Sequence, residues 1–128
     1  MGTLQKKKSK KKPKKIPKKV VLITTNTALK LATECVWRYC DLMTICLLDN
    51  NDRKEDYEIR LSISVSIYEK FHKIATEHRV TMELYEAMIV QKAIVRYMSG
   101  TENDFGRNAL ETFKLKLNQK IVNIKATI

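Results

Sequence analysis

The feature that most constrains this sequence is the charge of its first 19 residues, ten of which are lysine and none acidic. A block of like charge repels itself and offers little apolar surface to bury, so it predicts a disordered arm. Pro13 and Pro17 disfavour a helix within it. The remaining 109 residues carry 15 Lys and Arg against 14 Asp and Glu. We therefore expect a polycationic arm over 1–19 and one nearly neutral globular domain over 20–128.

The arm predicts a polyanionic partner, either nucleic acid or an anionic membrane surface. Nucleic acid is favoured because no stretch approaches 18 apolar residues and no signal-peptide core follows the basic start. Lys6 stands where a myristoylation signal has Ser or Thr, and an arm without a lipid binds membranes reversibly at best. The predicted phosphate contacts are Lys6, Lys7, Lys8, Lys10, Lys11, Lys12, Lys14, Lys15, Lys18 and Lys19.

The body has a mostly helical pattern, which predicts a predominantly helical α+β fold. Residues 20–26 form a β-branched run typical of a strand, and Asn26 or Thr27 can cap an amphipathic helix over 28–48. The polar stretch 49–56 predicts a loop.

The carboxyl-terminal region has a weaker pattern. Residues 101–119 indicate a loop followed by a short helix. Residues 121–128 alternate between apolar and polar side chains, which predicts a terminal strand that could pair with 20–25.

The middle of the body changes its period. Over 57–63, Ile59, Leu61 and Ile63 alternate with Glu58, Arg60 and Ser62, which predicts a half-buried strand. Spacing of three and four then predicts one helix over about 65–78 and a second over 81–98, which Thr81 can cap and Gly100 can end.

The predicted 81–98 helix is apolar over most of its surface, so it must be buried on more than one side. A partner chain is the favoured explanation, and a larger intramolecular core is the alternative. A lone strand at 57–63 also needs a second strand. Two copies that pair these strands antiparallel would meet both needs, and the polar faces would form a ribbon that fits the DNA major groove.

The stretch IRLSISVSIYEKFHKIATEHRVTMELYEAMI resembles the ribbon-helix-helix (Arc/MetJ-type) family of DNA-binding proteins, over residues 57–98 only. The resemblance implies a dimer that reads bases from the shared ribbon, through Arg60, Ser62 and Glu58. It also implies that Thr81 and the amides of Met82 and Glu83 grip a phosphate at a helix amino terminus. An ordinary α+β core is the alternative interpretation of the same stretch.

Motifs for catalysis or for a cofactor are lacking in the sequence. The chain has three glycines and no phosphate-binding loop, and its two histidines, His72 and His78, lack partners at ligand spacing. Cys35, Cys40 and Cys46 lie in an apolar helical stretch without a C-x-x-C pair. Reduced, packed thiols are favoured over a metal site or a disulfide. We expect no enzyme, no cofactor and no metal.

The sequence therefore predicts a homodimeric DNA-binding protein for transcription regulation or for plasmid or viral DNA handling. It would act in the cytoplasm on the nucleoid, or in the nucleus of a eukaryote. The alternative is a structural protein of RNA or ribonucleoprotein assemblies, whose helices bind protein partners.

Overall fold

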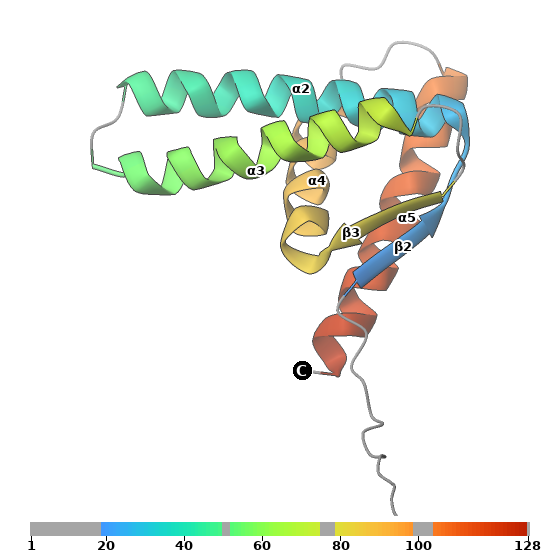
Figure 1. The fold of residues 1–128 in the computed structure, drawn as a ribbon. Helices are drawn as coiled ribbons and strands as arrows, with labels where there is room; N and C mark the ends of the chain where they lie inside the picture. The colour runs from blue at the N-terminus through green and yellow to red at the C-terminus, as the bar shows by residue number, and fades with distance from the viewer. Residues whose placement is uncertain (1–18, 50–51, 75–78, 99–103, 128) are drawn as a thin grey trace, which may run out of the picture.

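The computed structural model describes residues 19–49, 52–74, 79–98 and 104–127. Of the predicted arm, only Lys19 lies within these ranges. In the described part, four helices and one two-stranded antiparallel sheet (Figure 1) confirm the predominantly helical α+β prediction. The elements are β2 (Lys19–Ile23), α2 (Asn26–Asp49), α3 (Lys54–Lys73), β3 (Arg79–Glu83), α4 (Leu84–Tyr97) and α5 (Asp104–Ala126).

The sheet is a short ribbon that β2 and β3 form within one chain. The strand predicted at 20–26 is confirmed over Lys19–Ile23. Its β-branched residues suit an extended backbone, and alternate side chains point to opposite faces. One face joins the core through four buried side chains, namely Val20, Leu22, Val80 and Met82.

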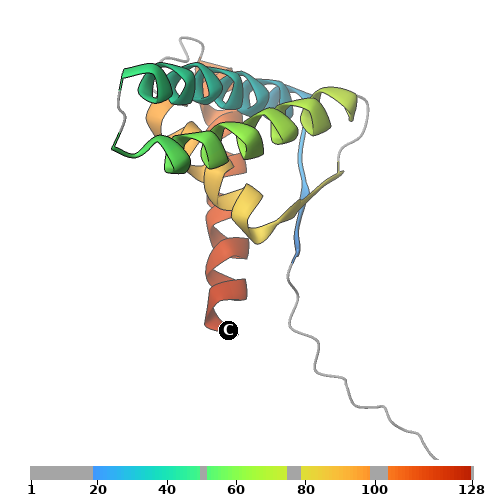
Figure 2. The ribbon, with the colours of Figure 1, turned by 60° about the vertical axis from the view of Figure 1, so that its left-hand side comes forward.

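α2 and α3 lie antiparallel, side by side, and project from the rest of the molecule as a helical hairpin (Figures 1 and 2). The helix predicted at 28–48 is confirmed. Thr25 supplies the cap, since its Oγ1 accepts a hydrogen bond from the Ala28 amide at 3.1 Å. The buried stripe of α2 consists of Ala28, Leu29, Ala32, Cys35, Val36, Tyr39, Cys40 and Met43.

The strand predicted at 57–63 is wrong, because these residues belong to α3. A helical stripe runs through them and continues along α3, and packing it against the core beside α2 outweighs the local alternation. Ile59, which the alternation placed in the core, is 59% exposed. The helix predicted at 65–78 is the second half of α3, and residues 75–78 lie outside the described ranges. The stripe consists of Tyr57, Leu61, Ser64, Ile67, Tyr68 and Phe71.

The helix predicted at 81–98 is α4, but it begins at Leu84. Glu83 is the N-cap residue and forms a capping box with Glu86, so the predicted cap at Thr81 is wrong. α4 contacts α2, α3, α5 and both strands (Figure 2). This intramolecular core covers much of its apolar surface, but Tyr85 and Val95 are 56% and 61% exposed, and the partner chain stays a prediction.

α5 replaces both the short helix and the terminal strand expected near the carboxyl terminus. The prediction of a strand at 121–128 is wrong, because α5 continues to Ala126. Spacing of three and four continues through this segment, so that Ile124 is buried while Val122 is 58% exposed. The same stripe contains Leu110, Phe113, Leu117, Ile121 and Ile124.

Candidate nucleic-acid interface

The three side chains predicted to read bases do not share one face. Glu58 and Ser62 are exposed on α3, while Arg60 is half-buried. Arg60 lines a groove between the hairpin and α4, together with Lys92 and Arg96. A helix turns successive residues by about 100° rather than 180°, so the alternating row predicted here is dispersed around α3. The prediction that a ribbon at 57–63 reads bases is therefore wrong, because this segment is helical.

The predicted phosphate grip at Thr81 and Met82 is also corrected. Both residues lie in β3, where Met82 is buried opposite Val20 and Thr81 is exposed opposite Val21. The helix amino terminus that follows is occupied by carboxylates, because Glu83 and Glu86 form its capping box. A phosphate there would meet negative charge instead of free amides.

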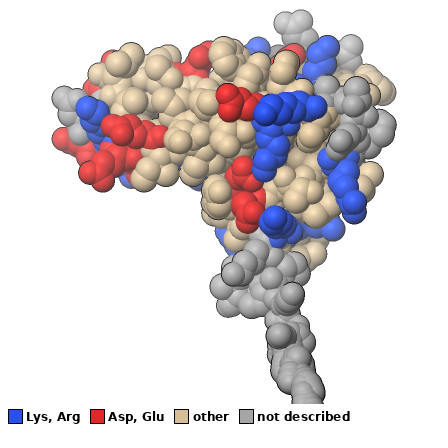
Figure 3. Space-filling view, in the orientation of Figure 1, with Lys and Arg blue, Asp and Glu red and all other residues tan. Residues whose placement is uncertain are grey.

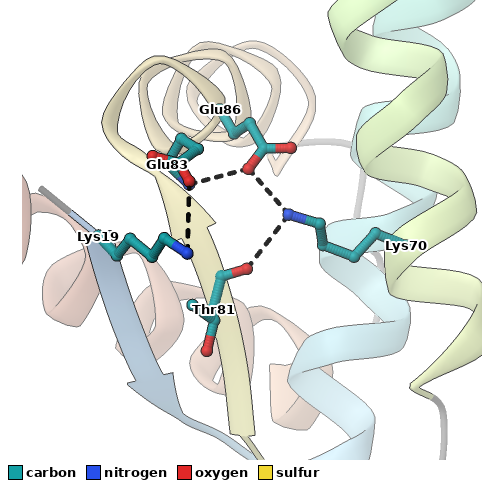
Figure 4. A network of polar contacts seen from close by, with 5 residues as sticks. All are labelled: Lys19, Lys70, Thr81, Glu83 and Glu86. Carbon is teal, nitrogen blue, oxygen red and sulfur yellow. Dashed lines mark hydrogen bonds and ion pairs between the residues drawn. The ribbon is translucent and has the colours of Figure 1, made fainter.

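A polar network ties β3 to α3 and α4 (Figure 4). Lys70 Nζ lies 2.8 Å from Glu86 Oε1 and donates to the Thr81 carbonyl at 3.3 Å. Glu86 Oε1 also accepts from the Glu83 amide at 2.8 Å. The Glu86 side chain is only 7% exposed, so these donors compensate the cost of burying its carboxylate. The network orients the ribbon on the helices.

The outward face of the ribbon carries basic side chains at both ends. Lys19 lies opposite Glu83, at 3.7 Å between Nζ and Oε2. Arg79 lies at the other end, opposite Ile23, and is exposed. The chain enters this ribbon directly from the lysine arm. The predicted ribbon paired residues 57–63 of two chains, whereas this ribbon pairs β2 with β3 of one chain.

α5 adds positive charge beside β2, against which it packs. From residue 112 onward the sequence contains four lysines and no acid. Lys116 Nζ donates to the Ile23 carbonyl at 3.1 Å, which places one of these charges at the ribbon. Lys120 and Lys125 are exposed further along the helix.

Charge is separated along the molecule. Residues 41–58, which include the hairpin tip, contain six acidic residues and two basic ones. In Figure 3 acidic side chains gather at the tip of the α2–α3 hairpin, and lysine and arginine are most frequent on the half that carries the sheet. A polyanion would therefore approach the ribbon half and be repelled from the tip.

Arg79 is the surface residue that the sequence prediction missed. It was taken as part of a break between two helices. The stretch RVTME alternates apolar Val80 and Met82 with polar residues, and that pattern could have indicated a strand. The strand was missed because it is short: its five residues also fit the start of the apolar helix that follows.

The cysteines are free, and Cys35 and Cys40 are buried in α2, whereas Cys46 is half-buried. Burial raises the pKa of the Cys35 thiol from 9.0 to about 11, although Arg38 acts in the opposite direction. Burial, reinforced by Asp41, likewise raises the pKa of the Cys40 thiol to about 11. Both groups are protonated thiols at neutral pH and pack as small apolar side chains.

Two features are absent from the described part of the chain. No group of three His, Cys, Asp or Glu side chains in that part of the chain is placed to hold a metal ion. Likewise, none of the helices described has both the length and the apolar character needed to cross a membrane.

No protein-family model matches the sequence, and no curated protein or solved structure is significantly similar to it. The functional inference therefore depends on the residues of this chain and on their geometry.

Proposed function

We propose that this chain is a nucleic-acid-binding protein that contacts phosphates with the arm, the outward ribbon face and the lysines of α5. The observation that carries the proposal is the place of the arm in the sequence, directly before β2. Nine lysines without an acid lead directly into a ribbon whose outward face presents Lys19 and Arg79. The ribbon lies at the end of the molecule remote from the acidic hairpin tip (Figure 1). Such a partner would place the chain in the cytoplasm on a nucleoid, or in a nucleus.

The proposal is tested by the salt dependence of binding. If about six to ten lysines contact phosphate, affinity falls by roughly 10³–10⁵ between about 50 and 200 mM salt. Fluorescence anisotropy with duplex DNA, single-stranded DNA and single-stranded RNA should show this slope for the full chain. Deletion of residues 1–18 should weaken binding to all three and flatten the slope.

Two single substitutions provide a matched pair. Arg79→Gln and Lys54→Gln remove the same charge, but Arg79 lies on the ribbon and Lys54 lies at the acidic tip. We expect Arg79→Gln to weaken binding several-fold and to lower the salt slope by about one, with no change for Lys54→Gln. Equal effects, or a preference for anionic vesicles over all three nucleic acids, would contradict the proposal.

An assembly protein associated with RNA is the second candidate, and exposed apolar residues on α5 favour it. Leu115 and Val122 are 59% and 58% exposed and lie seven residues apart, on one face of the helix. Such a face suits a protein partner or a second copy, and the homodimer stays a prediction. Light scattering of the full chain and of Leu115→Gln/Val122→Gln tests it. A monomer in both cases argues against self-association.

A further inference from the structure

A pocket opens between the first half of α2 and the second half of α3. Its volume is about 470 Å³, within the range of about 300–1,000 Å³ that is usual for small-ligand sites. Trp37, Tyr68 and His72 line one part of it, and Asn26, Lys30 and Glu34 contribute polar groups. The pocket is separate from the acidic hairpin tip, where the opposite ends of the two helices meet.

The aromatic residues form a continuous wall. The ring centroids of Trp37 and Tyr68 are 5.1 Å apart, at an interplanar angle of 44°. Those of Tyr68 and His72 are 5.8 Å apart, and these two rings are stacked at 20°. Trp37 remains 51% exposed although it belongs to a packed helix pair. Tyr68 and His72 therefore support the Trp37 indole, whose exposed surface is available to a flat ligand.

The polar groups around this wall match a nucleotide. The Lys30 ammonium suits a phosphate, and the Asn26 amide can donate to and accept from a base edge. The Glu34 carboxylate would repel a phosphate, but it can accept from an exocyclic amino group such as N4 of cytosine. A base in a duplex has both faces covered by its neighbours, whereas an unpaired base can be turned onto an aromatic side chain.

We propose that this pocket binds an unpaired base of a single-stranded nucleic acid, stacked on Trp37. The inference rests on the proposed function and adds a preference for single strands over duplexes. The arm and ribbon supply phosphate affinity to either form, and the pocket adds affinity only for the single strand.

The test uses the full chain and its own fluorescence. Trp37 is the single tryptophan of the sequence, so its emission reports this pocket directly. Single-stranded DNA should quench Trp37, and a duplex of equal length should bind, as anisotropy detects, with little quenching. Trp37→Ala should weaken single-strand binding by roughly 10-fold, in the range of one lost base stack, and leave duplex binding unchanged.

Three variants separate stacking from folding. Trp37→Phe keeps an aromatic face and should retain most of the affinity. Tyr85→Ala removes an aromatic of similar exposure, at 56%, from α4 and should change nothing. Circular dichroism checks that each variant is folded. The pocket proposal would be wrong if Trp37→Ala and Tyr85→Ala weakened single-strand binding equally. It would also be wrong if Trp37→Ala lowered the affinity for single strand and duplex by the same factor.

The two proposals fail in different ways. If quenching is absent but binding depends on the arm and on salt, the pocket is wrong and the proposed function stands. If single-stranded DNA quenches Trp37 in the chain lacking residues 1–18 and arm deletion changes no affinity, the pocket stands and the arm's role is wrong. Absence of any nucleic-acid binding overturns both.

Discussion

The segments 57–63 and 79–83 have the same kind of pattern and different structures. Both alternate apolar and polar residues, yet the first is part of α3 and the second is β3. In the first segment the alternating residue Ile59 is exposed, whereas in the second Val80 is completely buried. The comparison shows that a short alternating pattern is compatible with a strand but is not sufficient to form one.

The difference lies in what surrounds each segment. The first is followed by ten further residues that extend the helical stripe to Lys73, and α2 lies alongside to cover it. The second is followed directly by a capped helix, and β2 lies beside it to satisfy its backbone hydrogen bonds. Strand pairing therefore requires a partner edge, and only the second segment has one.

Replacing one apolar residue in each segment by glutamine gives the largest expected contrast. Val80→Gln places an amide in the core without a partner and should lower the free energy of unfolding by about 3–4 kcal/mol. Ile59→Gln, on the solvent side of a helix, should change it by less than about 0.5 kcal/mol. Urea denaturation measures both. A larger loss of unfolding free energy for Ile59→Gln than for Val80→Gln would support the strand prediction at 57–63.

Proline at Ser62 tests the helix directly. Ser62→Pro should lower the free energy of unfolding by about 3 kcal/mol, because proline removes a helical hydrogen bond and clashes with the preceding turn. Ser62→Ala should leave stability unchanged or raise it by a few tenths of a kcal/mol, since alanine favours helix. Thermal denaturation followed by circular dichroism distinguishes the two. Unchanged stability of the Ser62→Pro variant would contradict the helical structure of residues 57–63.

The ion pairs Lys70–Glu86 and Lys19–Glu83, which lie beside β3, should differ in strength. Lys70→Met leaves the buried Glu86 carboxylate without its cation and should lower the free energy of unfolding by about 1–3 kcal/mol. Lys19→Met breaks the exposed pair with Glu83 and should cost less than about 1 kcal/mol. Equal effects in urea denaturation would show that the network in Figure 4 does not hold the strand.

The thiols of α2 have no effect near neutral pH, and their contribution to stability changes only at alkaline pH. The raised pKa values of Cys35 and Cys40 mean that unfolded thiols ionise first, above pH 9, while the folded ones stay neutral to about pH 11. Stability from this source is complete below pH 9 and is lost as the pH rises towards 11. A Cys35→Ala/Cys40→Ala chain should lose less stability over that interval.

Reactivity with iodoacetamide provides a second measure of the same burial. At neutral pH we expect Cys46 to react in the folded chain, and Cys35 and Cys40 only after unfolding. Mass spectrometry of the digested protein assigns each site. Rapid alkylation of Cys35 would show that the core face of α2 is open.

The candidate site was only partly predictable. The lysine arm could be read from the sequence, because a block of like charge needs no tertiary context, and its polyanionic partner stays a prediction. The ribbon was expected at 57–63, but the outward basic residue Arg79 became visible only when β3 paired with β2. The pocket at Trp37 depends on Tyr68 and His72 from another helix, and one-dimensional spacing cannot show that they meet.

By itself the sequence determined what each stretch requires: the charge of residues 1–19 predicts an arm, and apolar spacing makes α2 and α4 helical and buried. The tertiary structure decided which surfaces meet those requirements. In the tertiary structure β2 is the partner of β3. Residues 57–63, whose alternation is only local, belong to α3 and pack beside α2. The physical reason is that hydrogen bonds within a helix are local, whereas strand pairing and burial depend on neighbours distant in sequence.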